Sequence, residues 1–294
     1  MKIEKMMEDW KNKLYSEIDL QPIIDEIGTQ KLLDTLLNNI GNAELYVRLN
    51  VATAFETIVG AESALSPDQY IHALNIGLSE THLFNGIGGN GDGDDAVLWR
   101  AYSTFVVADV IDVDGKQGFL SDAQYMGALD KAIQYMILEK DRRGFIYGGK
   151  GVVDAICHGA IMIAAFIAHP KFPKEYTCHV LDCVKCNIVG KGRFAADDRA
   201  GRDLAGIFDA LLNIGISEDT IKEWIDTLLP TMDTSIGKLT DEHYPYIQMS
   251  IDIEHFLMYL YFDFKKKSVH DKFRGWIFEY IDKLRAKAYM RGQA

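Results

Sequence analysis

Apolar residues recur at helical spacing, three or four positions apart, along almost the whole chain. No stretch between turn signals alternates apolar and polar residues over the length of a strand. The pattern therefore predicts an all-α fold. The expected helices lie near residues 3–17, 21–39 (broken around Gly28), 43–60, 67–78, 95–111, 122–138, 152–168, 174–189, 200–214, 218–229, 243–263 and 269–290.

The expected helices pair along the chain. Most connections between them are short and polar, which favours neighbouring helices packed side by side as antiparallel pairs. The pairs recur at roughly 40 to 50 residues, as in HEAT-like solenoids. We therefore expect a HEAT-like α-α superhelix that forms a single domain over residues 1–294, with capping helices at about 243–290. In the last helix, an apolar stripe should face inward and the basic side should face solvent; the stripe consists of Phe273, Trp276, Ile277, Tyr280, Ile281 and Leu284.

Several helix starts carry local signals. Ser66 precedes Pro67, which suits the first position of a helix, and Ser121 with Gln124 has the spacing of a capping box. The longest helix junctions, at 79–94 and 139–151, are both rich in glycine. Loops of this kind emerge on one edge of a solenoid, so the two junctions could share a surface that holds a ligand.

Composition and charge narrow the classes of function. The chain has 294 residues, 48% of them hydrophobic, and a net charge of −12. The negative charge argues against nucleic-acid binding, which requires a basic surface. The first residues lack an apolar signal segment and no later stretch is long and apolar enough for a membrane span, so we expect a cytoplasmic protein without a membrane partner. The charge is uneven: from Lys265 onward the net charge is +6, which leaves −18 for the rest.

The stretch EKDRRGFIYGGKGVVDAICHGAI, residues 139–161, holds most of the candidate chemistry. Asp154 and His158 are four residues apart, so a helix would place an aspartate beside an imidazole that could act as a general base or as half of a metal site. Glu139, Asp141 and Arg143 could add carboxylates and a fork for anions. The alternative is structural: Arg143 is held by Asp141, Glu139 or a nearby carboxylate, and the charged run is a clamp that aims the next helix.

Two other stretches resemble metal sites only in part. GGNGDGDD, residues 88–95, has alternating oxygen ligands but lacks the glycine and the glutamate of a calcium loop, so a loop that caps a helix is favoured. In TCHVLDCVKC, the side chains of His179, Cys183 and Cys186 would share one helical face and could bind zinc with a fourth ligand. Buried thiols that pack as small hydrophobic groups are the favoured interpretation, and no cofactor is expected.

The order of these landmarks resembles a bacterial family of unknown function known as DUF2785, whose members look like helical-repeat proteins. One block of the resemblance is Glu139, Asp141, Arg143, Gly144 and Phe145, and another is Gly151, His158, Gly159 and Ala160. An earlier helix matches with Arg100-Ala101-Tyr102-Ser103 and a later segment with DDRAGRDLA from Asp197, over roughly residues 30–230.

The chain departs from the family pattern at two positions. Asp154 stands where the family has a histidine, and Ile161 stands where it has an aspartate. A His, His, Asp constellation would therefore retain only His158 of its three members.

Two functions stay open at this point. The first is a helical-repeat binding or scaffold protein that recognises a protein, peptide or small ligand near residues 88–95 and 139–158. The second is a metal-assisted or acid-base hydrolase that uses Asp141, Asp154 and His158. The sequence contains no Gly-x-Ser-x-Gly elbow and no His-Glu-x-x-His motif that would assign catalysis. The candidate ligand-binding residues are Arg100, Glu139, Asp141, Arg143, Asp154 and His158.

Overall fold

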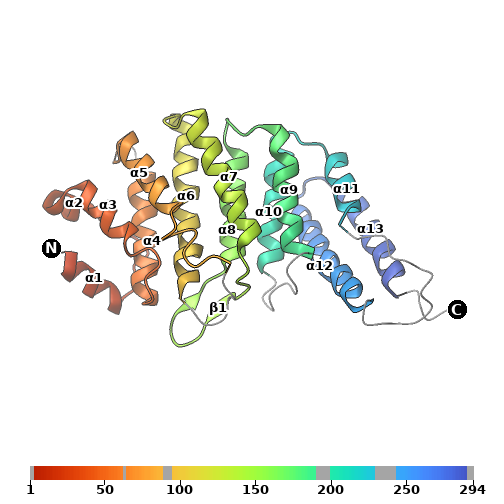
Figure 1. Ribbon diagram of the computed structural model, residues 1–294, viewed down its shortest axis with the longest axis horizontal. Helices are drawn as coiled ribbons and strands as arrows, with labels where there is room; N and C mark the ends of the chain where they lie inside the picture. Colours follow the sequence, from red (N-terminus) through yellow and green to blue (C-terminus); the bar gives the residue numbers. More distant parts are fainter. Residues whose placement is uncertain (1–2, 62–63, 89–94, 190–198, 229–242, 290–294) are drawn as a thin grey trace. The chain divides into compact units, whose positions relative to one another are not determined.

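The computed structural model describes residues 3–61, 64–88, 95–189, 199–228 and 243–289. Most of these residues are in helices (Figure 1). The α-helices are α1 (Ile3–Asn12), α2 (Gln21–Ile27), α3 (Thr29–Leu37), α4 (Leu45–Gly60), α5 (Pro67–Gly77), α6 (Ala96–Gln117), α7 (Asp122–Leu138), α8 (Ala155–Ala168), α9 (Thr177–Val189), α10 (Arg199–Asn213), α11 (Glu218–Asp226), α12 (His243–Lys267) and α13 (Asp271–Tyr289). A short 3₁₀ helix, Lys174–Tyr176, precedes α9. The all-α prediction is confirmed, and among the described residues no helix is both long enough and apolar enough to cross a lipid bilayer.

The local signals in the sequence mark true helix starts. At Ser121 the hydroxyl accepts from the backbone N–H of Gln124, and the Gln124 side chain accepts from the Ser121 N–H, which completes the predicted capping box. Ser66 and Gln69 form a second box at the start of α5. The break expected around Gly28 separates α2 from α3, where Gly28 has φ +80°.

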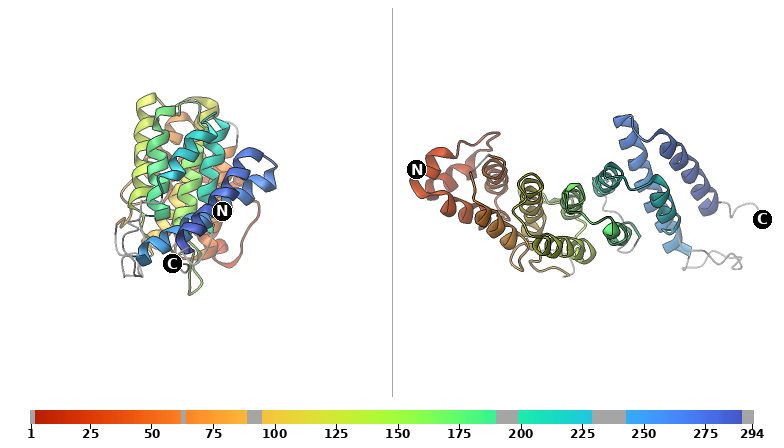
Figure 2. Two further views of the ribbon diagram at one scale, coloured as in Figure 1. Left: turned by 90° about the vertical axis from the view of Figure 1, so that its right-hand side faces the viewer. Right: turned by 90° about the horizontal axis from the view of Figure 1, so that it is seen from above.

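The chain divides into two compact units, residues 1–173 and 174–294. In the first unit, α6 is central and packs against α4, α5 and α8, while α7 packs on α8. Helices α6 to α8 are seen nearly end-on from above in Figure 2 (right), so they run roughly parallel to a common axis. In the second unit, α12 packs against α9, α10 and α13. The single-domain superhelix stays a prediction.

The predicted stripe of the last helix is largely buried. Phe273, Ile277, Ile281 and Leu284 are buried, whereas Trp276 and Tyr280 are half-buried. The stripe holds α13 against α12.

One element differs from the prediction. Residues 145–152 form a two-stranded antiparallel hairpin of β1 (Phe145–Ile146) and β2 (Gly151–Val152), in which Phe145 pairs with Val152. The predicted helix start at residue 152 is therefore too early, because β2 delays the first turn of α8 to Ala155. In Figure 1 the hairpin at β1 extends beyond the ends of α6 and α8.

Candidate functional site

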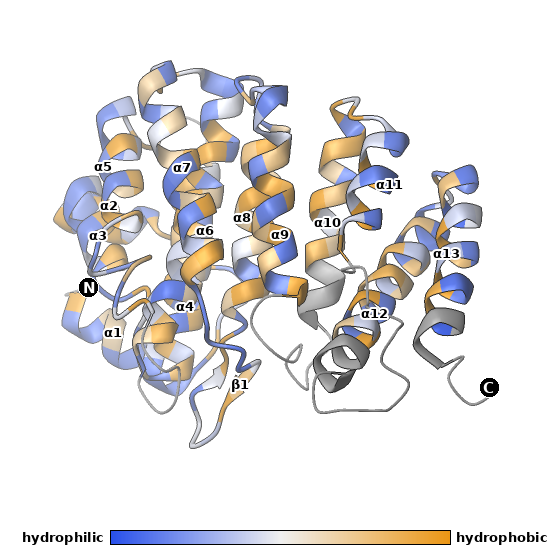
Figure 3. Ribbon diagram, turned by 45° about the vertical axis from the view of Figure 1, so that its right-hand side comes forward, coloured by the Kyte–Doolittle hydropathy of each residue, from blue (hydrophilic) through white to orange (hydrophobic). Residues whose placement is uncertain are grey.

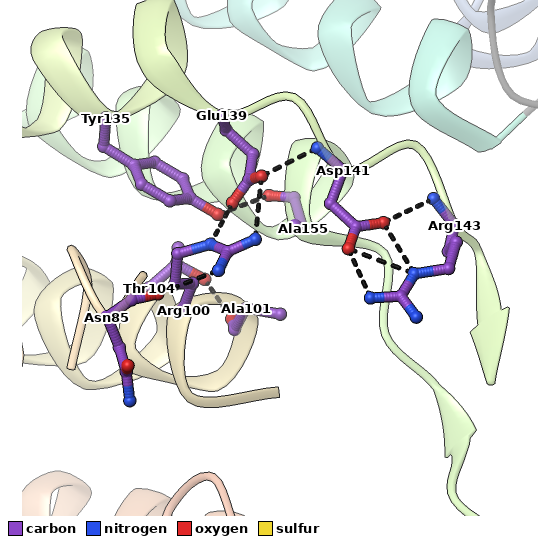
Figure 4. Close-up of polar contacts among 9 residues, drawn as sticks. All are labelled: Asn85, Arg100, Ala101, Thr104, Tyr135, Glu139, Asp141, Arg143 and Ala155. Carbon is purple, nitrogen blue, oxygen red and sulfur yellow. Dashed lines mark hydrogen bonds and ion pairs between the residues drawn. The ribbon is translucent and has the colours of Figure 1, made fainter. Parts of the chain in front are cut away.

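A buried ion pair joins α6 to the end of α7 (Figure 4). Arg100 Nε donates to Glu139 Oε2 at 2.6 Å, and Nη2 donates to Oε1 at 3.1 Å, so the pair is bidentate. Both side chains are almost fully buried. Arg100 Nη1 also donates to the backbone O of Asn85 at 2.8 Å. The guanidinium therefore ties the turn before α6 to the junction after α7.

Tyr135 completes the surroundings of this pair. Its hydroxyl donates to the backbone O of Ala155 at 3.1 Å, at the first residue of α8. Burial raises the pKa of Tyr135 well above its ordinary value, and the negative charge of Glu139 adds to the effect. For Arg100, burial lowers the guanidinium pKa, but the hydrogen bonds and charge of Glu139 outweigh it and leave that pKa raised. Tyr135 therefore stays neutral and Arg100 stays charged.

Asp141 forms the second ion pair, with Arg143. Arg143 Nη2 donates to Asp141 Oδ2 at 2.6 Å, and Arg143 Nε lies 3.0 Å from Oδ1. The backbone N–H of Arg143 also donates to Oδ1 at 2.9 Å, and the backbone N–H of Asp141 donates to Glu139 Oε1 at 2.8 Å. The predicted hold on Arg143 is confirmed, and the two pairs form one continuous network (Figure 4).

The far strand of the hairpin is fastened to α4 and α6. Arg48 in α4, fully buried with its guanidinium 4.9 Å from the Tyr102 ring centre, donates to the backbone O of Lys150. Lys150 Nζ in turn pairs with Asp95 at 2.6 Å. At Gly151 φ is +77°, so glycine suits the backbone angle, and a Cβ there would also displace the end of the Leu45 side chain, whose Cδ1 would lie 2.7 Å away.

The tip of the hairpin has the opposite character. Tyr147 is 86% exposed and Phe145 is 48% exposed, and their rings meet edge to face with centres 5.4 Å apart. Gly148 and Gly149 follow with positive φ and make the turn. In Figure 3 strand β1 is coloured as hydrophobic although it stands away from the helices. Sequence reasoning missed these aromatic side chains; the available signal was the apolar run FIY directly before a glycine pair.

Asp154 and His158 follow β2 along the chain. Asp154 is the residue before α8 and has left-handed backbone angles, φ 36° and ψ 50°, which aspartate adopts more readily than most residues. Its backbone O accepts from the N–H of His158 at 3.0 Å, so Asp154 starts the first turn of α8. His158 Nδ1 lies 3.2 Å from the backbone O of Ala101, and its ring packs on Phe105 with centres 4.3 Å apart. Because a carbonyl oxygen can only accept, Nδ1 is the protonated nitrogen.

The other two stretches that resemble metal sites in the sequence show no metal site in the described residues. Of GGNGDGDD at 88–95, for which the sequence favours a loop that caps a helix, residues 89–94 lie outside the described residues, as do Asp197 and Asp198 of DDRAGRDLA. Cys183 is buried and its thiol lies 3.0 Å from the backbone O of Val180, whereas Cys186 is half-buried. In the part of the chain that the structure describes, no three His, Cys, Asp or Glu side chains gather closely enough to hold a metal ion. The zinc alternative for His179, Cys183 and Cys186 therefore gains no support.

A comparison with protein families settles the predicted resemblance. Residues 83–262, more than half of the chain, match DUF2785, which is described as a protein of unknown function. The chain belongs to the DUF2785 family. The match begins later than the predicted residue 30 and extends beyond residue 230, so it includes both the hairpin and most of α12. No curated protein and no solved structure gives a significant match.

The charged candidates thus have internal partners. Arg100, Glu139, Asp141 and Arg143 bind one another and the backbone of neighbouring elements. Their assignment as ligand-binding residues stays a prediction. What this arrangement does physically is to fix both ends of a short hairpin whose exposed side chains are aromatic.

Proposed function

We propose that this member of the DUF2785 family is a helical-repeat binding protein, with a HEAT-like arrangement of helices, that docks a protein or peptide partner on its 145–152 hairpin. The observation that carries the proposal is the exposure of Tyr147 and Phe145 on a hairpin with a fixed base. Tyrosine supplies a large contact area with few rotatable bonds and is enriched among the side chains that dominate binding energy.

The fixed base supports the proposal energetically. A loop that is already ordered loses little conformational entropy when a partner binds, so more of the contact energy appears as affinity. The Asp141–Arg143 pair orders the first strand, and the hydrogen bond from Arg48 to Lys150 orders the second. The base of the hairpin is therefore ordered before any partner arrives.

The hydrolase alternative has weaker support. Both carboxylate oxygens of Asp141 accept from Arg143, so this carboxylate is already engaged. A general base must reach the proton that it removes. His158 Nδ1 points at a backbone carbonyl, which leaves its Nε2 as the atom that could act as a base in this alternative.

The test is quantitative co-purification with the full chain as bait. Tyr147→Ser removes the exposed ring, and Leu14→Ser is the matched control because Leu14 is an exposed apolar residue away from the hairpin. We expect a partner that wild type and Leu14→Ser retain equally and that Tyr147→Ser loses by roughly thirtyfold, the effect of a hot-spot side chain.

Two outcomes would count against this proposal. The first is a set of retained proteins that is the same for Tyr147→Ser and for Leu14→Ser. The second is hydrolysis of a simple ester or phosphodiester that His158→Ala abolishes and Tyr147→Ser leaves intact, which would favour the hydrolase.

A further inference from the structure

The second unit carries a groove of about 400 Å³ between α12 and α13. Its lining residues are Tyr261, Lys265, Asp271, Arg274, Gly275 and Phe278. The two helices meet through buried side chains that include Phe264, Phe273 and Ile277, so the groove follows the outer edge of a well-packed pair. It therefore has a floor that the core of the unit supports.

The apolar part of the groove is aromatic. Phe278 is 58% exposed, and its ring centre lies 6.4 Å from that of Tyr261. Phe262, 55% exposed, packs edge to face on Tyr261 at 5.3 Å and extends the apolar surface along α12. Gly275 leaves the space between the helices open, because a Cβ at this position would meet no atom within 4 Å. A side chain from outside could therefore pack on Gly275 beside the Tyr261–Phe278 pair.

The charged part of the groove is mostly basic. Lys265 is exposed and has no carboxylate in ion-pair range among the described residues; its ammonium lies 5.9 Å from the Tyr261 ring centre. Lys266 in α12 and Lys272 in α13 are also exposed. Arg274 pairs with Asp271, whose side chain is largely exposed and therefore open to exchange for another carboxylate.

Charge complementarity identifies the occupant. Lys265, Lys266 and Lys272 are exposed cations with no carboxylate in ion-pair range among the described residues, in a chain whose net charge is −12. The adjoining ends of α12 and α13 therefore form a local basic island. Negatively charged residues are attracted to such an island, and apolar side chains next to them would cover the aromatic rings. A nucleic acid is less suited, because phosphate binding depends on a basic field over a large surface and the chain as a whole is acidic.

We propose that the α12–α13 groove docks an acidic amphipathic segment of a partner protein. An apolar side chain of this segment packs on Gly275 beside the Tyr261–Phe278 pair, and the carboxylates of the segment pair with Lys265 and Arg274. This site is separate from the hairpin and does not depend on the function proposed for it.

The test is fluorescence anisotropy with the full chain and three labelled synthetic peptides. The first alternates glutamate pairs with phenylalanine and leucine, the second has alanine at the apolar positions, and the third has lysine in place of glutamate. We expect only the first to bind, with an affinity that falls as salt rises because exposed charges contribute.

Three variants locate the binding. Phe278→Ser removes the ring, Lys265→Glu reverses the charge, and Gly275→Leu fills the open space while replacing a residue that disfavours helices. Each should weaken binding of the first peptide by about tenfold or more, whereas Tyr147→Ser should leave it unchanged. Gly275→Leu also guards against misfolding, because its melting temperature should not fall.

Four results would overturn the proposal. The first result is that the peptide with alanine at the apolar positions binds as tightly as the first peptide. The second is that no peptide binds at millimolar concentration. A single-stranded oligonucleotide could bind more tightly than the first peptide and compete with it. Sedimentation could reveal self-association that Phe278→Ser abolishes, which would make a second copy of this chain the occupant.

Discussion

The base and the tip of the 139–152 junction divide charge and apolar surface in opposite ways. At the base, Arg100, Glu139 and Asp141 are charged residues that are buried and fully engaged with partners. At the tip, Phe145 and Tyr147 are apolar rings that stand in solvent. The charged residues, which drew attention in the sequence, build the scaffold, and the aromatic residues provide the surface that a partner could use.

Physical chemistry explains this division. A buried charge is tolerated only where an opposite charge and hydrogen bonds replace its water, as the Arg100–Glu139 fork does. An exposed aromatic ring forgoes the burial that would stabilise the fold. Its position on an ordered hairpin is therefore more readily explained by binding than by folding, and each comparison below is designed to test that assignment.

Glu139→Ala should have the largest effect. It leaves the Arg100 guanidinium buried without its carboxylate, which we expect to lower the free energy of unfolding by about 3 to 5 kcal/mol. Urea denaturation measures the change. The double variant Arg100→Leu with Glu139→Leu should lose less than Glu139→Ala, because no charge remains buried; equal losses would show that the ion pair is not the source of the effect.

Arg143→Ala should have the next largest effect. Its side chain is 27% exposed, but its partner Asp141 is almost fully buried. Removal of the guanidinium leaves Oδ2 without the Arg143 side chain and leaves Oδ1 with the backbone N–H of residue 143. We expect a loss of about 1 to 3 kcal/mol in the free energy of unfolding. Arg143→Lys is the control: it retains the charge and lacks the planar fork, so its loss should be intermediate. A Lys variant as unstable as the Ala variant would assign the effect to geometry alone.

Asp109 is a carboxylate without a positively charged side chain beside it among the described residues, in contrast to Glu139 and Asp141. It is half-buried in α6 with no hydrogen-bond or ion-pair partner among the described residues. Burial raises its pKa to about 7, with a further contribution from the negative charges of Glu56 and Asp112. Because the folded pKa lies above the unfolded value of about 3.9, the stabilising contribution is complete below pH 4 and is lost as pH rises through 7.

Asp109→Asn should therefore flatten the pH dependence of stability between about pH 4 and pH 8. At pH 8 we expect the variant to be more stable than wild type, with a free energy of unfolding that is larger by roughly 1 kcal/mol. The value is modest because the side chain retains some contact with solvent. Melting temperatures measured across this range test the sign. A variant that is less stable than wild type at pH 8 would mean that the Asp109 carboxylate makes favourable contacts in the folded protein.

The sequence predicts the helices better than it predicts the site. Capping signals such as Ser121 with Gln124 act within one turn, so they can be read locally. The Asp141–Arg143 pair was predictable for the same reason, since its members are two residues apart. Arg100 and Glu139 are 39 residues apart, and only the packing of α6 and α7 on α8 brings them together.

The hairpin shows a second limit of local patterns. Strands of two residues are too short for an alternation of apolar and polar positions to appear. Exposure is likewise a property of the folded chain: FIY in this loop has the same composition as a core segment, yet Tyr147 is exposed and Ile146 is half-buried. Apolar character alone therefore could not identify the proposed binding surface.

Tyr147→Ser should have the smallest effect on folding. The ring contacts Phe145 at the edge of the hairpin and is otherwise in solvent, so the free energy of unfolding should stay within about 0.5 kcal/mol of wild type. The melting temperature of the variant tests this expectation. A larger loss would mean that the tip contributes to the fold.

The most direct test of the division between base and tip is the urea unfolding of Arg143→Ala and Tyr147→Ser, measured side by side with partner retention. We predict that Arg143→Ala loses about 1 to 3 kcal/mol and that Tyr147→Ser stays within about 0.5 kcal/mol of wild type while it loses the partner. An Arg143→Ala variant that is as stable as wild type but no longer retains the partner would contradict the account, because the charged base would then be the binding surface.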